Sequence, residues 1–500
     1  MPMDLLTPRS LATPERPALI WGERTLTYRD LAGWAAALEQ VLAREGITAG
    51  TRVAALLPRE PVAVAAVHAL ARLEAVLVPL NLRLTAEEMR EQIARSGATH
   101  VLATPTTAER ARAVAGERRV MEMANEELGM VSEESGTAES PVPRNSPLAT
   151  RHSPLAILFT SGTTGRPKAA VLSAANFTWS AVTSAFRLGV LPDDRWLLTL
   201  PLYHVGGLSI LFRSALYSTA IILPEHEGPF DPVQLDAALR RHRATLVSLV
   251  PTMLYRLLQA VPGEPPAHLR IVLLGGAAAP VELLRQAHAR GYPVALTYGL
   301  TEAASQVATA TPAEVRSKPG SVGRPLFYTQ VRVVDEAGRD LPSGAVGEIV
   351  VRGPTVFLGY DSDPQATHTA LRDGWLHTGD LGYLDPDGAL WVVNRRSDLI
   401  VTGGENVYPA EVEAVLRQHP AVAEVCVVGI EDLEWGQRVA AVVVLHSDQQ
   451  AGPGDLEAHC RAHLAGYKVP RQWRFVDALP RTASGKIHRP AVRALLTPAT

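Results

Sequence analysis

Residues 155–168 have the sequence Leu-Ala-Ile-Leu-Phe-Thr-Ser-Gly-Thr-Thr-Gly-Arg-Pro-Lys, a short apolar run followed by a polar loop. The apolar run, residues 155–159, predicts a buried strand. The loop carries four hydroxyls, two glycines and two cations. Glycines let backbone N–H groups approach an anion closely, and hydroxyls and cations donate to phosphate oxygens. The loop therefore predicts a polyphosphate site, with a Ser/Thr/Gly surface turn as the alternative. The expected contacts are Thr160, Ser161, Gly162, Thr163, Thr164, Gly165 and Lys168.

On both sides of this loop the sequence alternates between strands and helices. Strands are predicted at 53–57, 75–80, 100–103, 196–200, 220–223, 245–250 and 271–274. Alternation of this kind predicts an α/β fold with parallel, doubly wound sheets, and its repetition predicts two related sheets packed together. A hairpin is predicted at 18–28, and Thr85 with Glu88 forms a capping-box pattern. Residues 132–154, rich in Ser, Glu and Pro, predict a mobile linker or a surface excursion.

The pattern changes in the last third of the chain. From about residue 331 the predicted strands become short and rich in turns, which indicates a small β-subdomain. After residue 398 the chain has a strand-helix pattern of its own. We expect a large N-terminal domain at 1–397 and a small, mobile α+β C-terminal domain at 398–500.

Composition narrows the class of protein. A chain of 500 residues is too long for one core. Its formal charge of −3 gives no electrostatic case for nucleic acid or an anionic membrane. Cys426 and Cys460 lie outside any metal or redox spacing. The sequence has no leader pattern and no apolar run of about 18 residues, so we expect a cytoplasmic protein without a membrane span.

Further segments carry polar groups where strands or turns end. Tyr298-Gly299-Leu300-Thr301-Glu302 follows a predicted strand at 293–297, and ligands of open α/β sheets bind beyond the carboxyl ends of strands. A carboxylate there can hold Mg²⁺ against phosphate oxygens. The alternative for Glu302 is a solvated side chain.

Three more segments have ordinary alternatives when taken one at a time. Gly275-Gly276-Ala277 is either a ligand-binding turn or a tight strand-to-helix turn. Thr378-Gly379-Asp380 is predicted to end a loop, where Asp380 suits a ribose diol. Lys486 lies in a Ser/Gly-rich loop that could carry it to a distant site, although most such lysines are solvated.

Taken in their order along the chain, these segments resemble the motifs of the adenylate-forming superfamily, which contains acyl-CoA synthetases, peptide-synthetase adenylation domains and beetle luciferases. The resemblance covers about residues 156–487. It implies ATP, Mg²⁺ and coenzyme A as a co-substrate, and it allows a homodimer. A carboxylate would attack the ATP α-phosphate, and a thiol would then attack the acyl-adenylate while the C-terminal domain rotates between the two steps.

The resemblance also implies a role for each matching residue. The catalytic residues would be Lys486, Glu302 (through Mg²⁺), Thr301 (at the α-phosphate) and His204. The nucleotide contacts would be Gly275, Gly276, Ala277, Tyr298, Gly299, Asp380 and Arg395, with Asp398 as the hinge and Gly403 and Gly404 along the pantetheine tunnel.

The acid substrate depends on two residues after the strand at 196–200. His204 is either a packed or gating residue or a catalytic one. Arg213 interrupts an apolar helix, and a buried cation is costly unless it is paired. It is therefore either half of a structural ion pair or an anchor for a second carboxylate on the substrate. The expected substrate contacts are His204, Arg213, Ser305 and Gln306.

Residues 200–214, 250–254, 273–276 and 298–306 are similar to one subgroup, the o-succinylbenzoate–CoA ligases of menaquinone biosynthesis. A general aryl or medium-chain acyl-CoA synthetase remains an alternative, as does a carrier-loading adenylation domain or a luciferase-like oxygenase. A catalytically dead nucleotide-binding protein is the alternative from another class, and the presence of Glu302, Asp380 and Lys486 argues against it.

Overall fold

The computed structural model describes residues 4–124, 153–160, 167–225, 227–394, 399–446, 449–481 and 487–496. Most of the predicted linker at 132–154 lies outside these ranges, as do several predicted site residues. Those residues are Ser161, Gly162, Thr163, Thr164, Gly165, Arg395, Asp398 and Lys486. Within the described part of the chain, no helix combines the length and the apolar character needed to cross a membrane.

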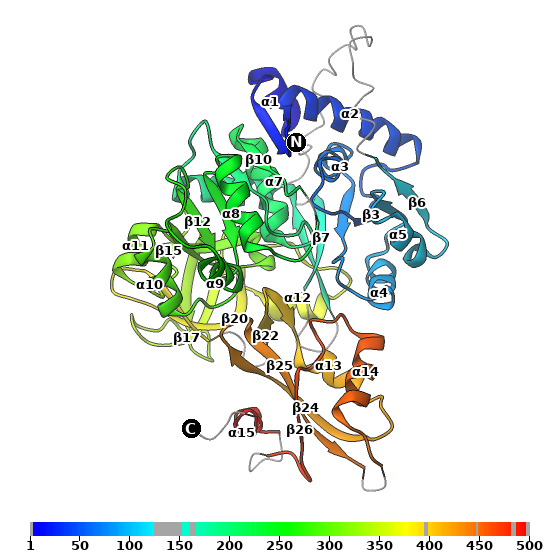
Figure 1. Cartoon of the computed structure of the whole chain (residues 1–500), viewed down its shortest axis with the longest axis vertical. Helices are drawn as coiled ribbons and strands as arrows, with labels where there is room; N and C mark the ends of the chain where they lie inside the picture. Colours follow the sequence, from blue (N-terminus) through cyan, green and yellow to red (C-terminus); the bar gives the residue numbers. More distant parts are fainter. Residues whose placement is uncertain are drawn as a thin grey trace.

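Two large sheets form the N-terminal part (Figure 1). The first has the order β15 (Arg324–Pro325), β14 (Ser305–Ala310), β13 (Val294–Leu300), β12 (Ile271–Leu274), β11 (Leu246–Leu249), β9 (Arg195–Leu197), β10 (Ala220–Ile222), β1 (Pro17–Trp21), β2 (Arg24–Thr27). The second has the order β18 (Gly359–Tyr360), β8 (Lys168–Ser173), β7 (Pro154–Thr160), β4 (Val76–Pro79), β3 (Arg52–Leu56), β5 (His100–Ala103), β6 (Arg119–Glu122). Their central strands are parallel, and the outer pairs β1–β2, β14–β15 and β8–β18 are antiparallel whereas β5–β6 is parallel. This arrangement confirms the doubly wound prediction.

One hydrophobic core joins the two sheets through helices α3 (Pro61–Arg72) and α7 (Val205–Tyr217). Apart from its last residue, α3 is buried along its whole length, which explains why its sequence is apolar on every face. Residues of α3 and α7 meet around Phe212. Helix α4 (Ala86–Ser96) begins at the predicted capping box of Thr85 and Glu88.

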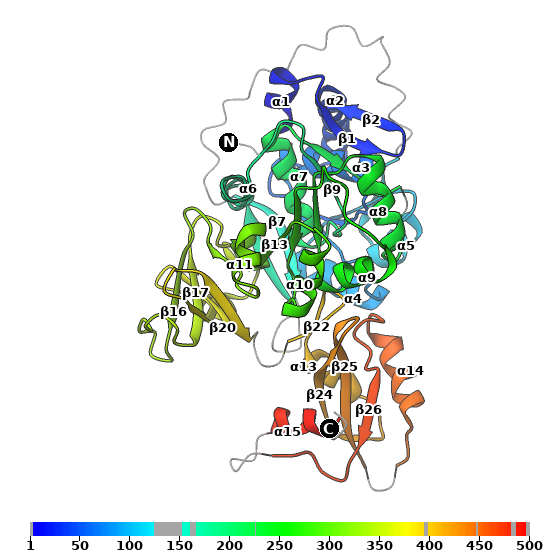
Figure 2. The same cartoon turned by 60° about the vertical axis from the view of Figure 1, so that its left-hand side comes forward.

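Two smaller sheets complete the chain, and Figure 2 shows both projecting from the N-terminal core. The first is the predicted β-subdomain: β16 (Gln330–Val334), β17 (Gly347–Arg352), β20 (Trp375–Leu384), β19 (Leu371–Arg372) and β21 (Leu390–Asn394). The second contains β23 (Glu405–Val407), β22 (Ile400–Thr402), β25 (Gly436–Leu445), β24 (Val422–Asp432) and β26 (Gln472–Phe475). Helices α13 (Pro409–Leu416) and α14 (Pro453–His463) pack on this second sheet over a core of their own.

Two local predictions were wrong. Thr378-Gly379-Asp380 lies inside β20 and not in a loop. It forms a bulge opposite Ile349, with Gly379 at a φ of +72°, because β17 pairs with β20 at His377 before it and at Leu381 after it. Strand β13 continues through Leu300, because β14 folds back on it as an antiparallel partner. Strands β22 and β23 form a β-hairpin whose turn is Gly403 and Gly404, at φ values of +59° and +84°.

Candidate active site

The predicted site residues lie just beyond the carboxyl ends of parallel strands. His204 follows β9, Gly275 and Gly276 follow β12, and Thr301 and Glu302 follow β13. This is the edge of an open α/β sheet at which ligands bind. Thr160 ends β7 of the other sheet and faces Lys168 across the β7–β8 pair.

A carboxylate and an ammonium group meet at one corner of this edge through Tyr360. The Tyr360 hydroxyl donates to Glu302 Oε1 at 2.7 Å, and Lys168 Nζ lies 5.0 Å from the centroid of the Tyr360 ring. Tyr360 reaches this place because β18 pairs with β8. Carboxylate oxygens suit Mg²⁺ and ammonium groups suit phosphate, so the side chains present fit a magnesium–polyphosphate ligand.

A second corner joins the predicted adenine and ribose residues. The Tyr298 hydroxyl donates to Asp380 Oδ2 at 2.7 Å, although the two residues come from different sheets. Asp380 is 8% exposed, and Thr378 holds its strand by donating to the Ile349 carbonyl at 2.7 Å. An aromatic ring beside a fixed carboxylate fits a nucleoside, and the adenine contact of Tyr298 and the ribose contact of Asp380 stay predictions.

The pairing of β13 with β14 requires a glycine at position 299, near the end of β13. A Cβ atom at Gly299 would lie 1.6 Å from the Ser305 carbonyl oxygen. Ala304 and Ser305 both have left-handed backbone, at φ values of +49° and +103°. Strain of this kind persists only when the surroundings hold it, and it concentrates at functional sites. The glycine of this motif therefore has a structural role, and its predicted cofactor contact stays a prediction.

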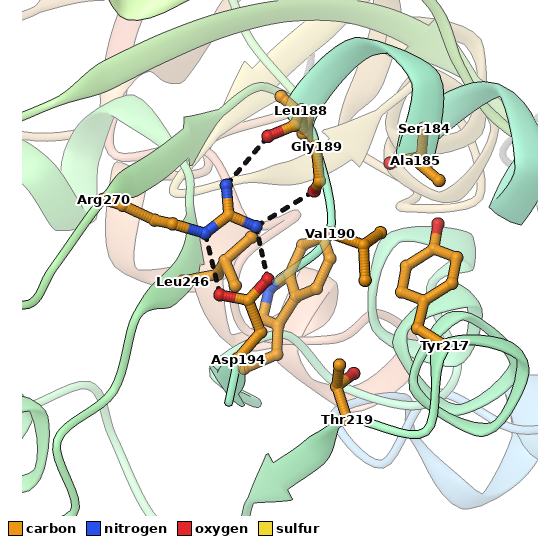
Figure 3. A pocket seen from close by; sticks show the side chains of 11 residues that line it. Ser184, Ala185, Leu188, Gly189, Val190, Asp194, Tyr217, Thr219, Leu246 and Arg270 are labelled. Atoms are coloured by element: carbon orange, nitrogen blue, oxygen red, sulfur yellow. Dashed lines mark hydrogen bonds and ion pairs between the residues drawn. The ribbon is translucent and has the colours of Figure 1, made fainter. Parts of the chain in front are cut away.

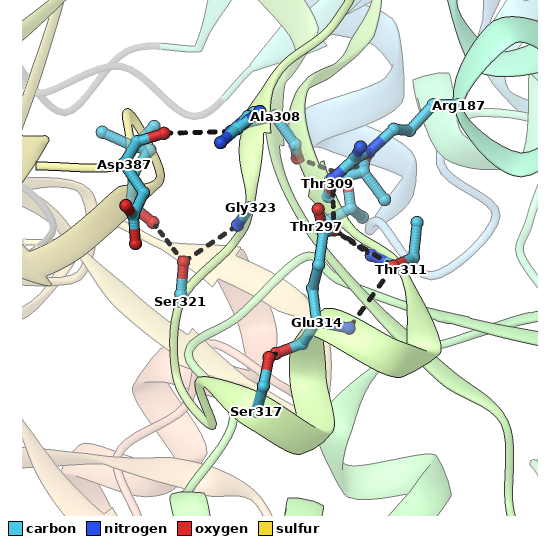
Figure 4. A network of polar contacts seen from close by, with 12 residues as sticks. Arg187, Thr297, Ala308, Thr309, Thr311, Glu314, Ser317, Ser321, Gly323 and Asp387 are labelled. Atoms are coloured by element: carbon cyan, nitrogen blue, oxygen red, sulfur yellow. Dashed lines mark hydrogen bonds and ion pairs between the residues drawn. The ribbon is translucent and has the colours of Figure 1, made fainter. Parts of the chain in front are cut away.

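Polar contacts hold the β13–β14 pair in register (Figure 4). The Thr297 hydroxyl donates to the Ala308 carbonyl at 3.0 Å, and Arg187 Nε donates to the Thr309 carbonyl at 2.6 Å. Gln306 is buried and donates to the Thr309 hydroxyl at 2.9 Å. Part of its side chain is thus used within the fold, and its substrate contact stays a prediction.

Arg213 lies in α7 and is 1% exposed. Its Nη2 donates to the hydroxyls of Ser180 at 3.2 Å and Ser305 at 3.3 Å, and its guanidinium carbon lies 5.6 Å from the Trp196 ring centroid. Burial lowers the pKa of Arg213. Within the described ranges no carboxylate lies within ion-pair distance of it, so the structural ion pair that the sequence allowed is not formed there.

A small cavity at the opposite end of the same sheet gives a contrast (Figure 3). It lies where β9 and β11 begin, which is the amino end of these strands. Arg270 pairs there with Asp194 through Nε at 2.7 Å and Nη2 at 2.5 Å, and it also donates to the carbonyls of Leu188 and Gly189. Because its polar groups are satisfied and it faces away from the predicted residues, this cavity is not the candidate site.

The C-terminal hairpin β22–β23 reaches the same edge as the predicted residues. His204 Nε2 lies 3.3 Å from Glu405 Oε2, and Arg83 Nη1 lies 3.2 Å from Glu405 Oε1. Burial would raise the pKa of Glu405, but the neighbouring His204 and Arg83 more than offset it, and the pKa is lowered. A Cβ atom at Gly404 would lie 3.0 Å from the side chain of Val250.

Gly276 approaches the same Val250 side chain, at 3.3 Å from its own ideal Cβ position. The hairpin glycines and the glycines after β12 are therefore neighbours. Sequence reasoning missed Tyr360, Glu405 and Arg83 as parts of this edge. The Gly359-Tyr360 pair after the apolar Phe357-Leu358 was the available signal for Tyr360, and the acidic residue next to a glycine pair was the signal for Glu405.

Comparison with known proteins defines the class. A model of the AMP-binding enzyme family matches residues 8–361, and one of the AMP-binding enzyme C-terminal domain matches residues 411–486. The chain therefore belongs to the AMP-binding enzyme family. It is 40% identical to the 2-succinylbenzoate–CoA ligase of Geobacillus sp. (strain WCH70), over 98% of this chain and 97% of the relative. It is 39% identical to the ligase of the same name from Bacillus subtilis, over 97% and 96%.

Solved structures of the same class match this chain with different TM-scores. A double mutant of o-succinylbenzoate CoA synthetase from Bacillus subtilis, bound to the product analogue OSB-NCoA, matches with a TM-score of 0.88 at 37% identity, over 99% of this chain and 98% of the other. The same enzyme with the acyl-adenylate OSB-AMP matches with a TM-score of 0.71 at the same identity and coverage. The amide bond synthetase McbA from Marinactinospora thermotolerans scores 0.87 at 31% identity, over 99% and 100%.

Proposed function

We propose that this chain ligates 2-succinylbenzoate to coenzyme A through an acyl-adenylate, forming 2-succinylbenzoyl-CoA, AMP and pyrophosphate in menaquinone biosynthesis. The near full-length relatives support this reaction, and one structure of the Bacillus subtilis enzyme contains ATP and a magnesium ion. ATP, Mg²⁺ and coenzyme A are accordingly the proposed ligands, and a cytoplasmic location and a homodimer belong to the same proposal.

In the first half-reaction the substrate carboxylate attacks the ATP α-phosphorus and pyrophosphate leaves. Both reactants are anions, so fixed positive charge and hydrogen-bond donors contribute most to catalysis. Lys168 and the 160–165 loop bind the phosphates, Thr301 contacts the α-phosphate, and Lys486 neutralises charge at the reacting phosphorus. Glu302 would hold Mg²⁺, which would supply further neutralisation when bound. Tyr360 orients the Glu302 carboxylate.

The nucleoside is positioned by residues from two sheets. Asp380 accepts from the ribose hydroxyls, with Arg395 as the second contact, while Gly275, Gly276 and Ala277 line the adenine and Tyr298 stacks on it. In the second half-reaction the thiol of coenzyme A attacks the acyl carbonyl and AMP leaves. Asp398 is the hinge between the proposed domains at 1–397 and 398–500. Gly403 and Gly404 line the thiol's approach beside His204, whose ring Glu405 orients.

The choice of acid substrate rests on the surroundings of Arg213. The buried guanidinium is held by two hydroxyls and meets no carboxylate among the described residues. A buried cation without an anionic partner is costly, so a bound anion would be a stabilising complement. 2-Succinylbenzoate supplies one: its succinyl carboxylate is activated while its ring carboxylate remains as the anion for Arg213.

The test is pyrophosphate release with ATP and Mg²⁺, with and without coenzyme A, over 2-succinylbenzoate, benzoate, 4-coumarate and octanoate. Selective turnover of 2-succinylbenzoate with formation of its CoA thioester is expected. Turnover of monocarboxylic acids alone would contradict the proposed substrate and leave a general acyl-CoA synthetase. Turnover with an amine but not with coenzyme A would favour the amide-forming reaction of McbA. Absence of AMP release with every acid would indicate a nucleotide-binding protein without catalysis.

A further inference from the structure

A second group of charges, outside the catalytic motifs, joins the C-terminal part of the chain to helix α4. The segment 465–468 follows α14 and lies against the N-terminal part. Ala465 is buried in the same core cluster as Met89 and Ile93 of α4. Tyr467 packs against both this cluster and the core of the C-terminal sheet. The segment 465–468 therefore packs against the N-terminal part.

Lys468 is the centre of this contact. It is 3% exposed, and its Nζ lies 2.6 Å from Glu88 Oε1 and 2.6 Å from Glu411 Oε1. Glu88 belongs to the N-terminal part and Glu411 to α13 of the C-terminal part. Burial alone would lower the pKa of Lys468, and the two carboxylates more than reverse this effect. Without the ammonium group, two carboxylates would face each other across a buried contact, which is unfavourable.

Glu88 is held in place from its other side. Its Oε2 accepts from the backbone N–H of Thr85 at 2.7 Å and from the Thr85 hydroxyl at 2.9 Å. The capping box of α4 thus fixes one carboxylate oxygen and leaves Oε1 directed at Lys468. Because the cap does not depend on the C-terminal part, the α4 side of the contact is preformed.

The contact belongs to one arrangement of the two parts. In this structure the Gly403–Gly404 turn lies beside Val250 and Gly276, at the sheet edge that carries the predicted nucleotide-binding residues. The chain as a whole matches the product-analogue complex of the Bacillus subtilis enzyme better than its acyl-adenylate complex. Glu411 and Lys468 lie in the same part and can stay together when that part moves, whereas Glu88 cannot. A contact made in only one of two arrangements shifts the population toward that arrangement.

We propose that Lys468, bound between Glu88 and Glu411, is a positioning residue that holds the C-terminal part in the arrangement used for thioester formation. The proposal rests on the proposed two-step function. It assigns to Glu88, a residue of the cap of α4, a role in the second step alone.

Glu88→Gln is the main test, because glutamine can still accept from Thr85 but carries no charge toward Lys468. Adenylation is measured as ATP–pyrophosphate exchange with 2-succinylbenzoate in the absence of coenzyme A. Thioester formation is measured in a single turnover of preformed acyl-adenylate with coenzyme A. We expect exchange within about twofold of wild type and thioester formation slower by about tenfold, within the usual range of a coupling between two states. Glu87→Gln, an exposed neighbour in the same first turn, should change neither rate.

A second variant tests the same contact from the C-terminal side. Lys468→Met should show the same selective loss, and adding Glu88→Gln to it should cause little further loss, since both changes remove one contact. Equal loss of both half-reactions, or full thioester formation in Glu88→Gln, would overturn the proposal. If wild type shows no ATP–pyrophosphate exchange with any acid, the proposed function itself is wrong. Because this result comes from wild type alone, it is distinguishable from a failure of the Lys468 proposal, which shows only in the variants.

Discussion

Arg270 and Arg213 are two arginines near Trp196 that the fold treats in opposite ways. Trp196 lines the cavity beside Arg270, and Arg213 lies over its ring. Arg270 donates hydrogen bonds to both carboxylate oxygens of Asp194 and to two backbone carbonyls. Arg213 is more deeply buried, yet the side-chain hydrogen bonds it donates go to two serine hydroxyls and not to a carboxylate. The difference teaches that a buried guanidinium with a carboxylate partner supports the fold, whereas one without such a partner is available to an anion that the fold does not supply.

The largest expected effect is on the stability that depends on Arg270. Arg270→Met removes the ion partner of the buried Asp194 and should cost about 3–5 kcal/mol in the free energy of unfolding. Urea denaturation measures this loss. Adenylation per folded molecule should be unchanged, because Arg270 lies at the amino ends of the strands. The double variant Asp194→Asn/Arg270→Met should recover part of the stability, and a single-variant loss below about 1 kcal/mol would contradict the structural role.

Arg213→Met should behave in the opposite way. Replacing a buried charge that lacks a carboxylate partner by an apolar side chain should leave the free energy of unfolding unchanged or raise it by about 1–4 kcal/mol. Activity with 2-succinylbenzoate should nevertheless fall. The same denaturation experiment is the measurement. If Arg213→Met were as destabilising as Arg270→Met, the distinction between the two arginines would be wrong.

His68 is a third buried basic residue, and unlike the two arginines it can become neutral when it is buried. Burial lowers its pKa from 6.5 to about 4, so the folded state keeps it neutral where the unfolded state binds a proton. Between these two values the unfolded state holds more protons, and stability falls as the pH falls, by about 1.4 kcal/mol per pH unit from this residue. His68→Leu should flatten this part of the stability profile between pH 6.5 and 4, measured by urea denaturation at each pH. An unchanged slope would show that His68 is not the group responsible.

The smallest expected effect concerns the hydroxyl that holds Arg213. Ser305→Ala removes one of its two hydrogen bonds and should lower kcat/KM for 2-succinylbenzoate by roughly fivefold, the equivalent of about 1 kcal/mol. Steady-state kinetics measure this change. Ser317→Ala is the matched control, since its exposed hydroxyl donates to the Glu314 carbonyl away from the site. Equal effects of the two variants would remove Ser305 from the anchor.

Much of the fold followed from local sequence. The run at 271–274 is a buried strand with the predicted limits, and the Thr85–Glu88 cap is formed as predicted. Local patterns succeed here because one buried element or one turn of helix determines them. The loop predicted at Thr378-Gly379-Asp380 is instead a bulge within β20, because pairing of His377 and Leu381 with the distant β17 keeps the segment in the sheet.

Long-range side-chain pairs could not be predicted in the same way. Tyr360 and Glu302 lie 58 residues apart, and Lys468 and Glu88 lie 380 apart. No spacing rule connects residues so far apart in the chain, so Glu302 was predicted without the tyrosine that orients it. The sequence singled out Arg213 but left its role open, because only the surroundings of the side chain distinguish an ion pair from an anchor.

The most direct test compares two acids that differ by one group. 4-Oxo-4-phenylbutanoate is 2-succinylbenzoate without its ring carboxylate. The measurement is kcat/KM for CoA-thioester formation from both acids, in wild type and in Arg213→Met. We predict that wild type prefers 2-succinylbenzoate by about 100-fold, the equivalent of about 2.7 kcal/mol, and that the variant loses most of this preference. A preference that survives in Arg213→Met would contradict the anchor, and a wild type that does not distinguish the two acids would contradict the proposed substrate.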